Sequence, residues 1–210
     1  MSEPRLTFPS SLPREGRSMG IPIVLSAPSG AGKTTIRQGT VKALSDVVAS
    51  TSFTTRPARP GEPEGMDYHF ISDDEFDRMV RDGEFAEWAI VHNNRYGTPA
   101  RFLEEKLAKG FDVILTLDLQ GAKSLKKRYP QAVTVFLLPP SFGELRERLL
   151  ARGTNDSLEL EERLKHGQQM ISEVSGYDYL IINRKVEETV RHLVAIILAE
   201  RLRPWRTTTG

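Results

Sequence analysis

A run of small residues that ends in a lysine and two threonines carries the clearest chemistry in the sequence. The run is Ala27, Pro28, Ser29, Gly30, Ala31, Gly32, Lys33, Thr34 and Thr35. Small residues allow successive backbone N–H groups to turn inward around a polyphosphate, and a following helix directs its positive N-terminal end at the same anion. Lys33 is placed to reach the β- and γ-phosphates of a nucleoside triphosphate, and Thr34 offers a hydroxyl to Mg²⁺. The run therefore predicts a P-loop, and the competing interpretation is a turn that binds nothing.

A second set of residues suited to an anion lies in segment 52–62. Arg56 and Arg59 stand three positions apart there, among prolines that exclude a helix and stiffen an extended backbone. Guanidinium groups present paired donors to phosphate oxygens, and a stiff loop loses little entropy on binding. Arginines in a proline-rich loop are also commonly solvated. The segment alone leaves both interpretations open.

Short apolar runs alternate with amphipathic stretches along most of the chain. The predicted parallel strands are residues 21–25, 111–117, 132–138 and 179–182. The predicted helices are residues 33–44, 74–81, 99–108, 121–127, 141–150, 157–174 and 186–201. Alternation of this kind predicts an α/β fold in which helices cover both faces of a parallel core sheet, giving three layers.

Two stretches depart from this alternation. Residues 52–64 are turn-rich, and alternating runs at 69–71 and 85–91 predict antiparallel strands, so we expect an inserted subdomain at about 52–100. A charged excursion at about 146–175 interrupts the core between two strands and predicts a mobile helical lid.

Composition limits the class of protein. A chain of 210 residues can bury a substantial core as a single domain, which we place at 20–203 between flexible tails at 1–19 and 204–210. The absence of cysteine excludes disulfides and thiolate metal sites. No apolar run reaches membrane-spanning length, and a net charge of +1 gives no bulk attraction for nucleic acid or anionic membrane. We expect a cytoplasmic monomer or small homo-oligomer that binds small molecules, neither nucleic acid nor membrane.

Several motifs occur together in a fixed order. They are the P-loop run, the TTRPARPGE run around Arg56, Asp67-Tyr68, Glu87-Trp88-Ala89, Tyr96-Gly97-Thr98, Asp118-Leu119-Gln120-Gly121 and Arg152-Gly153-Thr154. In order and spacing the series resembles guanylate kinases, over about residues 20–201. The resemblance implies a P-loop NTPase fold with a GMP-binding insertion and a helical lid. It also implies phosphoryl transfer from ATP, with Mg²⁺, to GMP and dGMP in purine nucleotide metabolism.

The resemblance also implies a role for individual residues. The GMP phosphate would be bound by Arg56, Arg59, Tyr68 and Tyr96, and the guanine by Ser52, Glu87, Thr98 and Asp118. Arg152 and Arg163 of the lid would act with Lys33 on the transferred group, Arg148 would contact ATP phosphates, and Asn183 would lie beside the adenine of ATP.

The chemistry of the bases supports a guanine-reading role for Glu87 independently. Guanine presents two adjacent N–H donors on its Watson–Crick edge, so an ionised Glu87 can accept two hydrogen bonds from guanine, whereas adenine would leave the carboxylate unpaired. An unpaired buried group discriminates by orders of magnitude. Thr98 is expected to complete the contact by donating to O6. The alternative for Glu87 is a solvated charge on a strand.

One residue departs from the family pattern, and other functions compete. Thr116 stands where family members commonly carry the first carboxylate of an Asp-x-Asp-x-Gln-Gly run, which predicts weaker magnesium binding if that carboxylate helps to hold the hydrated ion. A non-catalytic binding module with this fold would typically have a degraded P-loop, and a kinase of a phosphorylated sugar would give Glu87 nothing to pair with. A generic P-loop GTPase lacks support, because the chain contains no Asn-Lys-x-Asp guanine box.

Overall fold

A five-stranded parallel sheet forms the core of the computed structural model, which describes residues 19–59, 61–91, 93–151 and 157–206. Its strands are β1 (Pro22–Ser26), β2 (Val47–Ala49), β7 (Asp112–Thr116), β8 (Val133–Leu138) and β9 (Tyr179–Ile182), in the spatial order β2-β7-β1-β8-β9. Each neighbouring pair runs parallel. The four strands expected from apolar runs are confirmed to within two residues at each end, and β2 is an additional strand that the sequence did not indicate.

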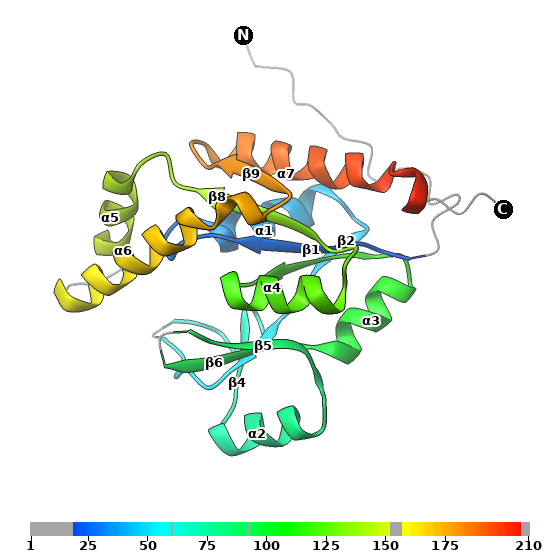
Figure 1. Cartoon of the computed structure of the whole chain (residues 1–210), viewed down its shortest axis with the longest axis horizontal. Coiled ribbons are helices and arrows are strands. Elements are labelled where there is room, and N and C mark those ends of the chain that lie inside the picture. The colour runs from blue at the N-terminus through cyan, green and yellow to red at the C-terminus, as the bar shows by residue number, and fades with distance from the viewer. Residues whose placement is uncertain (1–18, 60, 92, 152–156, 207–210) are drawn as a thin grey trace, which may run out of the picture.

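Helices cover both faces of this sheet (Figure 1). Helices α1 (Lys33–Ala43) and α7 (Val186–Arg201) pack on one face, and α3 (Ala100–Ala108) and α4 (Leu119–Arg128) on the other. Successive residues of β1 serve opposite layers, because Ile23 joins the α1 and α7 core whereas Val24 joins the α3 and α4 core. This alternation is the two-residue period of a strand that is buried on both faces. The three-layer α/β prediction is confirmed.

A second, four-stranded sheet lies between α1 and α3 in the chain. It contains β3 (Ser52–Thr54), β4 (Tyr68–Phe70), β5 (Phe85–Val91) and β6 (Asn94–Pro99), in the order β4-β3-β6-β5, together with helix α2 (Asp73–Arg81). The antiparallel expectation holds for β5, which pairs with β6, but is wrong for the run at 69–71, because β4 pairs in parallel with β3. Segment 52–64 also begins with a strand instead of turns.

Two further helices form a small unit after β8. Helices α5 (Phe142–Ala151) and α6 (Ser157–Ser172) share a core of Leu145, Leu149 and Leu160, and the short 3₁₀ helix η1 (Val174–Gly176) leads from them to β9. They extend away from the core sheet at one side of the molecule (Figure 1). Within the described ranges the structure contains no helix long and apolar enough to cross a membrane.

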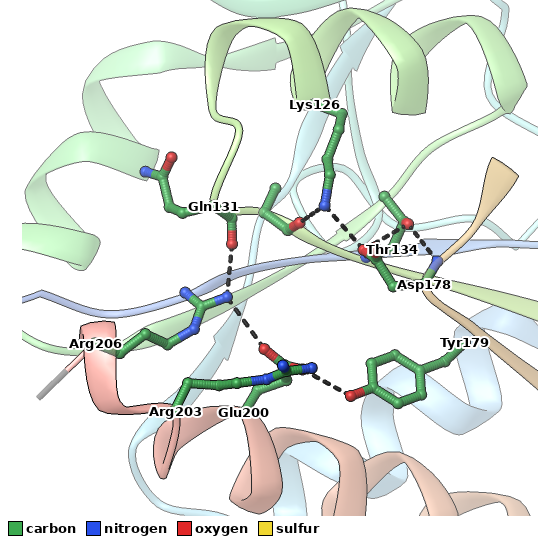
Figure 2. A network of polar contacts seen from close by, with 9 residues as sticks. Lys126, Gln131, Thr134, Asp178, Tyr179, Glu200, Arg203 and Arg206 are labelled. Atoms are coloured by element: carbon green, nitrogen blue, oxygen red, sulfur yellow. Dashed lines mark hydrogen bonds and ion pairs between the residues drawn. The ribbon is translucent and has the colours of Figure 1, made fainter.

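The C-terminal turn is docked onto the core, whereas the sequence predicts a flexible tail from residue 204. Pro204–Arg206 form the 3₁₀ helix η2. The Arg206 Nη2 group donates to the Gln131 carbonyl at 2.8 Å and to Glu200 Oε2 at 3.3 Å, and Glu200 also accepts from the Tyr179 hydroxyl at 2.6 Å (Figure 2). These contacts hold the turn against the strand starts of β8 and β9.

A buried ionic cluster joins the end of α7 to the starts of the core strands. The Arg201 guanidinium donates to Asp112 Oδ2 at 2.7 Å and to Asp46 Oδ1 at 2.8 Å. Asp112 Oδ1 accepts the backbone N–H of Ile21 at 2.8 Å. All three charged side chains are at most 5% exposed, so their mutual pairing replaces the hydration that burial removes.

Candidate active site

The predicted P-loop connects β1 to α1 and adopts the backbone that its glycines permit. Gly30 and Gly32 have φ values of +87° and +96°, a left-handed conformation that side-chain-bearing residues rarely adopt. Ala27, where the P-loop pattern has its first glycine, has a negative φ and therefore fits without strain. The Lys33 Nζ group donates to the Ala27 carbonyl, so the lysine is folded back over the loop that it follows.

Asn183 supports this loop from behind. Its Nδ2 group donates to the Ala31 carbonyl at 2.8 Å, and its Oδ1 accepts from the Thr189 hydroxyl at 3.0 Å. A Cβ on Gly32 would stand 2.7 Å from Nδ2. Asn183 is only 4% exposed. Both functional ends of its amide thus face protein groups, an arrangement that suits a support for the P-loop better than the expected contact with adenine.

A single cavity of about 850 Å³ brings the P-loop together with the second sheet and α6. The predicted site residues that line it are Ala27, Pro28, Ser29, Gly30, Gly32, Lys33, Thr34, Thr35, Ser52, Arg56, Arg59, Tyr68, Glu87, Tyr96, Asp118 and Arg163. Ala31, Thr98, Arg148 and Asn183 do not line it, and Arg152 lies outside the described residues. The volume lies in the range of small-molecule sites.

Glu87 and Thr98 face each other across the β5–β6 pair. They are in register, and the Thr98 hydroxyl donates to Glu87 Oε1 at 2.6 Å. Thr98 is fully buried and Glu87 is 6% exposed. A hydroxyl carries one hydrogen, and Thr98 uses it here to orient the carboxylate. The sequence had instead led to the expectation that Thr98 donates this hydrogen to O6 of guanine.

The electrostatics of Glu87 are those of a carboxyl in a desolvated position. Burial is the main cause and raises the pKa of Glu87 to about 7; the hydrogen bond from Thr98 opposes this shift, and the Asp118 carboxylate adds to it. Asp118 lines the same cavity and caps α4, because its Oδ1 accepts the Gly121 N–H at 2.8 Å. The cap also explains why α4 begins at Leu119, two residues before the predicted start.

Arg56 forms the centre of the predicted phosphate clamp. Its Nη2 group donates to both oxygens of Glu62, at 2.8 and 2.9 Å, and its guanidinium lies over the Tyr68 ring. Glu62 Oε2 also accepts the Arg59 N–H at 3.0 Å. Burial opposes both charges. Pairing with Glu62 nevertheless raises the pKa of Arg56, and the Arg59 N–H together with Arg56 lowers the pKa of Glu62. Glu62 lies in the motif around Arg56, but sequence reasoning assigned it no role.

Helix α6 presents one face to the cavity. Arg163, His166 and Met170 line it, and the Arg163 Nη1 group donates to the Ser29 hydroxyl of the P-loop at 3.1 Å. The helical spacing from Arg163 could have indicated His166, which sequence reasoning missed. Arg148 of α5 instead pairs with Glu144 at 3.0 Å, one turn earlier on the same helix.

An ion pair links the P-loop helix to the second sheet. Arg37 of α1 is buried and donates to the Asp67 carboxylate, which lines the cavity beside Tyr68. The Asp67 carbonyl accepts the Ser52 N–H at 3.4 Å. Sequence reasoning noted Asp67 only as part of a motif, because the partner on α1 is thirty residues away.

The donor set suits a magnesium ion that takes most ligands from phosphates and water. Thr34 and Thr116 both line the cavity. Among the described residues no three histidine, cysteine or acidic side chains cluster as a metal site. Mg²⁺ commonly keeps several waters and binds through few protein groups together with substrate phosphates, so a single threonine hydroxyl in a P-loop fits this ion.

Comparison with known proteins gives consistent matches over most of the chain. The guanylate kinase family model matches residues 19–200. The guanylate kinase of Syntrophotalea carbinolica is 47% identical over 187 residues, which cover 89% of each chain, and that of Geobacter sulfurreducens is 46% identical, covering 89% of this chain and 92% of its own. The crystal structure of the guanylate kinase from Anaplasma phagocytophilum superposes with a TM-score of 0.76 at 36% identity and covers 92% of each chain.

Proposed function

Because this chain belongs to the guanylate kinase family and transfers a phosphoryl group from ATP to GMP, we propose how its own residues perform that transfer. The family and its relatives favour neither a kinase of a phosphorylated sugar nor a non-catalytic binding module.

We propose that the P-loop and the second sheet hold the two substrates at opposite ends of one cavity. Backbone N–H groups of the P-loop and Lys33 bind the ATP phosphates, since P-loop residues and Lys33 line the cavity at the start of α1. Arg56, Arg59, Tyr68 and Tyr96 bind the GMP phosphate, and Ser52, Glu87 and Asp118 bind the guanine. The supporting observation is that Glu87, buried and oriented by Thr98, lines the same cavity as Lys33.

The transfer itself needs positioning more than proton chemistry. An oxygen of the GMP phosphate attacks the γ-phosphorus in line; the new O–P bond forms as the bond to the β–γ bridging oxygen breaks, and that oxygen leaves with ADP. A phosphate monoester is already a competent nucleophile, so no general base is required. Arg163, with Arg152 outside the described residues, supplies positive charge to the equatorial oxygens, where charge develops in the transition state.

Mg²⁺ is proposed as the metal, with Thr34 as its protein ligand. When bound, the ion neutralises charge on the β- and γ-phosphates. We further propose that dGMP is accepted, because the proposed contacts go to the base and the phosphate. We also propose a cytoplasmic location, with which the lack of cysteine is compatible, and no nucleic-acid partner, because the charges nearly balance. The expected monomeric or small homo-oligomeric state belongs to the same proposal.

The test is ADP formation by the purified chain with ATP and Mg²⁺, offered GMP, AMP, CMP, UMP or a ribose phosphate in turn. We expect turnover with GMP alone, and a loss of about 100-fold in kcat/KM for GMP in Glu87→Gln, because an amide cannot accept both guanine donors. Full activity of Glu87→Gln with GMP would contradict the assignment of Glu87. Turnover with the ribose phosphate alone would contradict the acceptor.

A further inference from the structure

Gly121, in the first turn of α4, lies directly against the Glu87 carboxylate. A Cβ placed on Gly121 would stand 2.6 Å from Glu87 Oε2 and 3.3 Å from Asp118 Oδ1. A carbon and an oxygen that are not bonded do not approach to 2.6 Å without displacement of one of them. No side chain other than hydrogen fits here with Glu87 in its present position.

The Glu87 carboxylate is therefore held by Thr98 at one oxygen, and its other oxygen occupies space that a Cβ at position 121 would fill. Thr98 donates to Oε1 at 2.6 Å from the neighbouring strand, and the absence of a Cβ on Gly121 leaves room for Oε2. Asp118 approaches the same place, because its Oδ1 accepts the Gly121 N–H at 2.8 Å. One glycine thus lets two carboxylates, one from β5 and one from the cap of α4, converge at the wall of the cavity.

We propose that Gly121 is a specificity-determining positioning residue, which places Glu87 and Asp118 to accept hydrogen bonds from the N–H donors of guanine. The inference rests on the proposed function, in which these carboxylates bind the base. Gly121 itself touches no substrate; it acts by leaving room for the group that does.

The position of the clash decides what a substitution would disturb. The atom nearest to the added Cβ is the end of a flexible side chain, so Glu87 can turn aside while the backbone of α4 and β5 stays in place. Alanine also favours a helix more than glycine does. Gly121→Ala should therefore leave the fold as stable as before, or more stable, while moving the carboxylate that reads the base.

The first experiment is steady-state kinetics of Gly121→Ala with GMP and ATP varied separately. We expect KM for GMP to rise about tenfold or more, the cost of misaligning a charged hydrogen bond, with KM for ATP within about twofold and an unfolding midpoint no lower than that of the parent. The matched control is Gly143→Ala, a glycine of α5 where a Cβ would meet only Ser141 Oγ at 3.6 Å. An unchanged KM for GMP would overturn the inference, as would a Gly121→Ala chain that does not fold.

A compensating substitution tests the steric cause. Glu87→Asp shortens the side chain by one methylene. As a single variant it should weaken GMP binding, but combined with Gly121→Ala it should relieve the steric clash. We expect the double variant to bind GMP more tightly than the two single losses predict, measured by calorimetric titration with GMP. Strictly additive losses would count against the steric explanation.

The outcomes separate this inference from the function on which it rests. If Glu87→Gln keeps full use of GMP, the base-reading role of Glu87 fails, and this inference fails with it. If Glu87→Gln loses activity but Gly121→Ala does not, the function stands and the role of Gly121 is wrong.

Discussion

Arg163 of α6 donates a hydrogen bond to the Ser29 hydroxyl of the P-loop at 3.1 Å. The two residues are 134 positions apart, and their contact brings a cation from the predicted lid to the loop that we propose binds the ATP phosphates. In the proposed arrangement this charge lies close to the transferred γ-phosphoryl group, and catalysis by such groups depends on charge that is already in position.

Replacing Arg163 with methionine should lower kcat by at least about 100-fold, because charge on the transferred group would lose a partner. KM for GMP should change little, since Arg163 contacts Ser29 of the P-loop. Rapid-quench measurement of ADP formation checks this. Lys165→Met, at an exposed position of the same helix, is the matched control and should keep its rate. A fully active Arg163→Met would refute the role.

Glu87 should make stability depend on pH. Its folded pKa of about 7 lies above its ordinary value, so the folded state binds more protons than the unfolded chain between about pH 4.5 and 7, and stability falls as pH rises through that window. Glu87→Gln removes the buried charge and should stabilise the ligand-free protein at pH 8.5 by on the order of 1–3 kcal/mol, but little at pH 4.5. Urea unfolding at both values tests this.

Glu147→Gln, at an exposed position of α5, is the control for this comparison. Its effect on the free energy of unfolding should be the same at both pH values. A Glu87→Gln variant with the same stability gain at both pH values would show that ionisation of Glu87 costs the folded state nothing.

Asn183→Ala should weaken the use of every nucleoside triphosphate to a similar degree. The hydrogen bonds of the Asn183 side chain with Ala31 and Thr189 support the P-loop. Their loss should raise KM for the phosphoryl donor about tenfold. A contact with adenine would instead affect ATP and spare CTP. Parallel assays with ATP and CTP as donors distinguish the two roles, and a loss confined to ATP would restore the interpretation based on adenine.

Thr116→Asp should reduce the free Mg²⁺ needed for half-maximal activity. Thr116 and Thr34 line one cavity, and carboxylate oxygens are favoured partners of Mg²⁺ and its waters. Chelation should abolish turnover in both proteins. Thr116→Asn, which adds no charge, is the control and should shift the Mg²⁺ titration less. If Thr116→Asp left the Mg²⁺ titration of activity unchanged, position 116 would lie too far from the metal to affect it.

Arg201→Met should destabilise the fold by about 3–5 kcal/mol, because it leaves Asp46 and Asp112 buried without their cation. Arg203→Met provides the comparison, since the Arg203 side chain is 53% exposed and its loss should cost about 1 kcal/mol or less. Denaturant unfolding at pH 7.5 measures both. Equal losses of unfolding free energy in the two variants would mean that burial does not make the Arg201 ion pairs more important for stability than an exposed pair.

Strong local patterns predicted the elements that carry them. Apolar runs at β1, β7, β8 and β9 identified the core strands, since a parallel strand buried on both faces must be apolar throughout. Strands β2, β3 and β6 were missed. β3 opens a segment whose prolines indicate turns, and β6 contains Asn, Gly and Pro, which are depleted in strands. The parallel pairing of β4 with β3 depends on the path of the chain between them, which a local pattern does not encode.

The sequence by itself determined the fold class and the order of the motifs, because the glycines of the P-loop and the apolar periods of strands and helices act within a few residues. Only the tertiary structure decided which groups meet. It joined Thr98 to Glu87, Asn183 to Ala31 and Arg163 to Ser29, and it brought Gly121 against the Glu87 carboxylate. These pairings depend on strand register and helix packing, which bring together residues from distant parts of the chain, and the burial that raises the pKa of Glu87 exists only once those elements have packed.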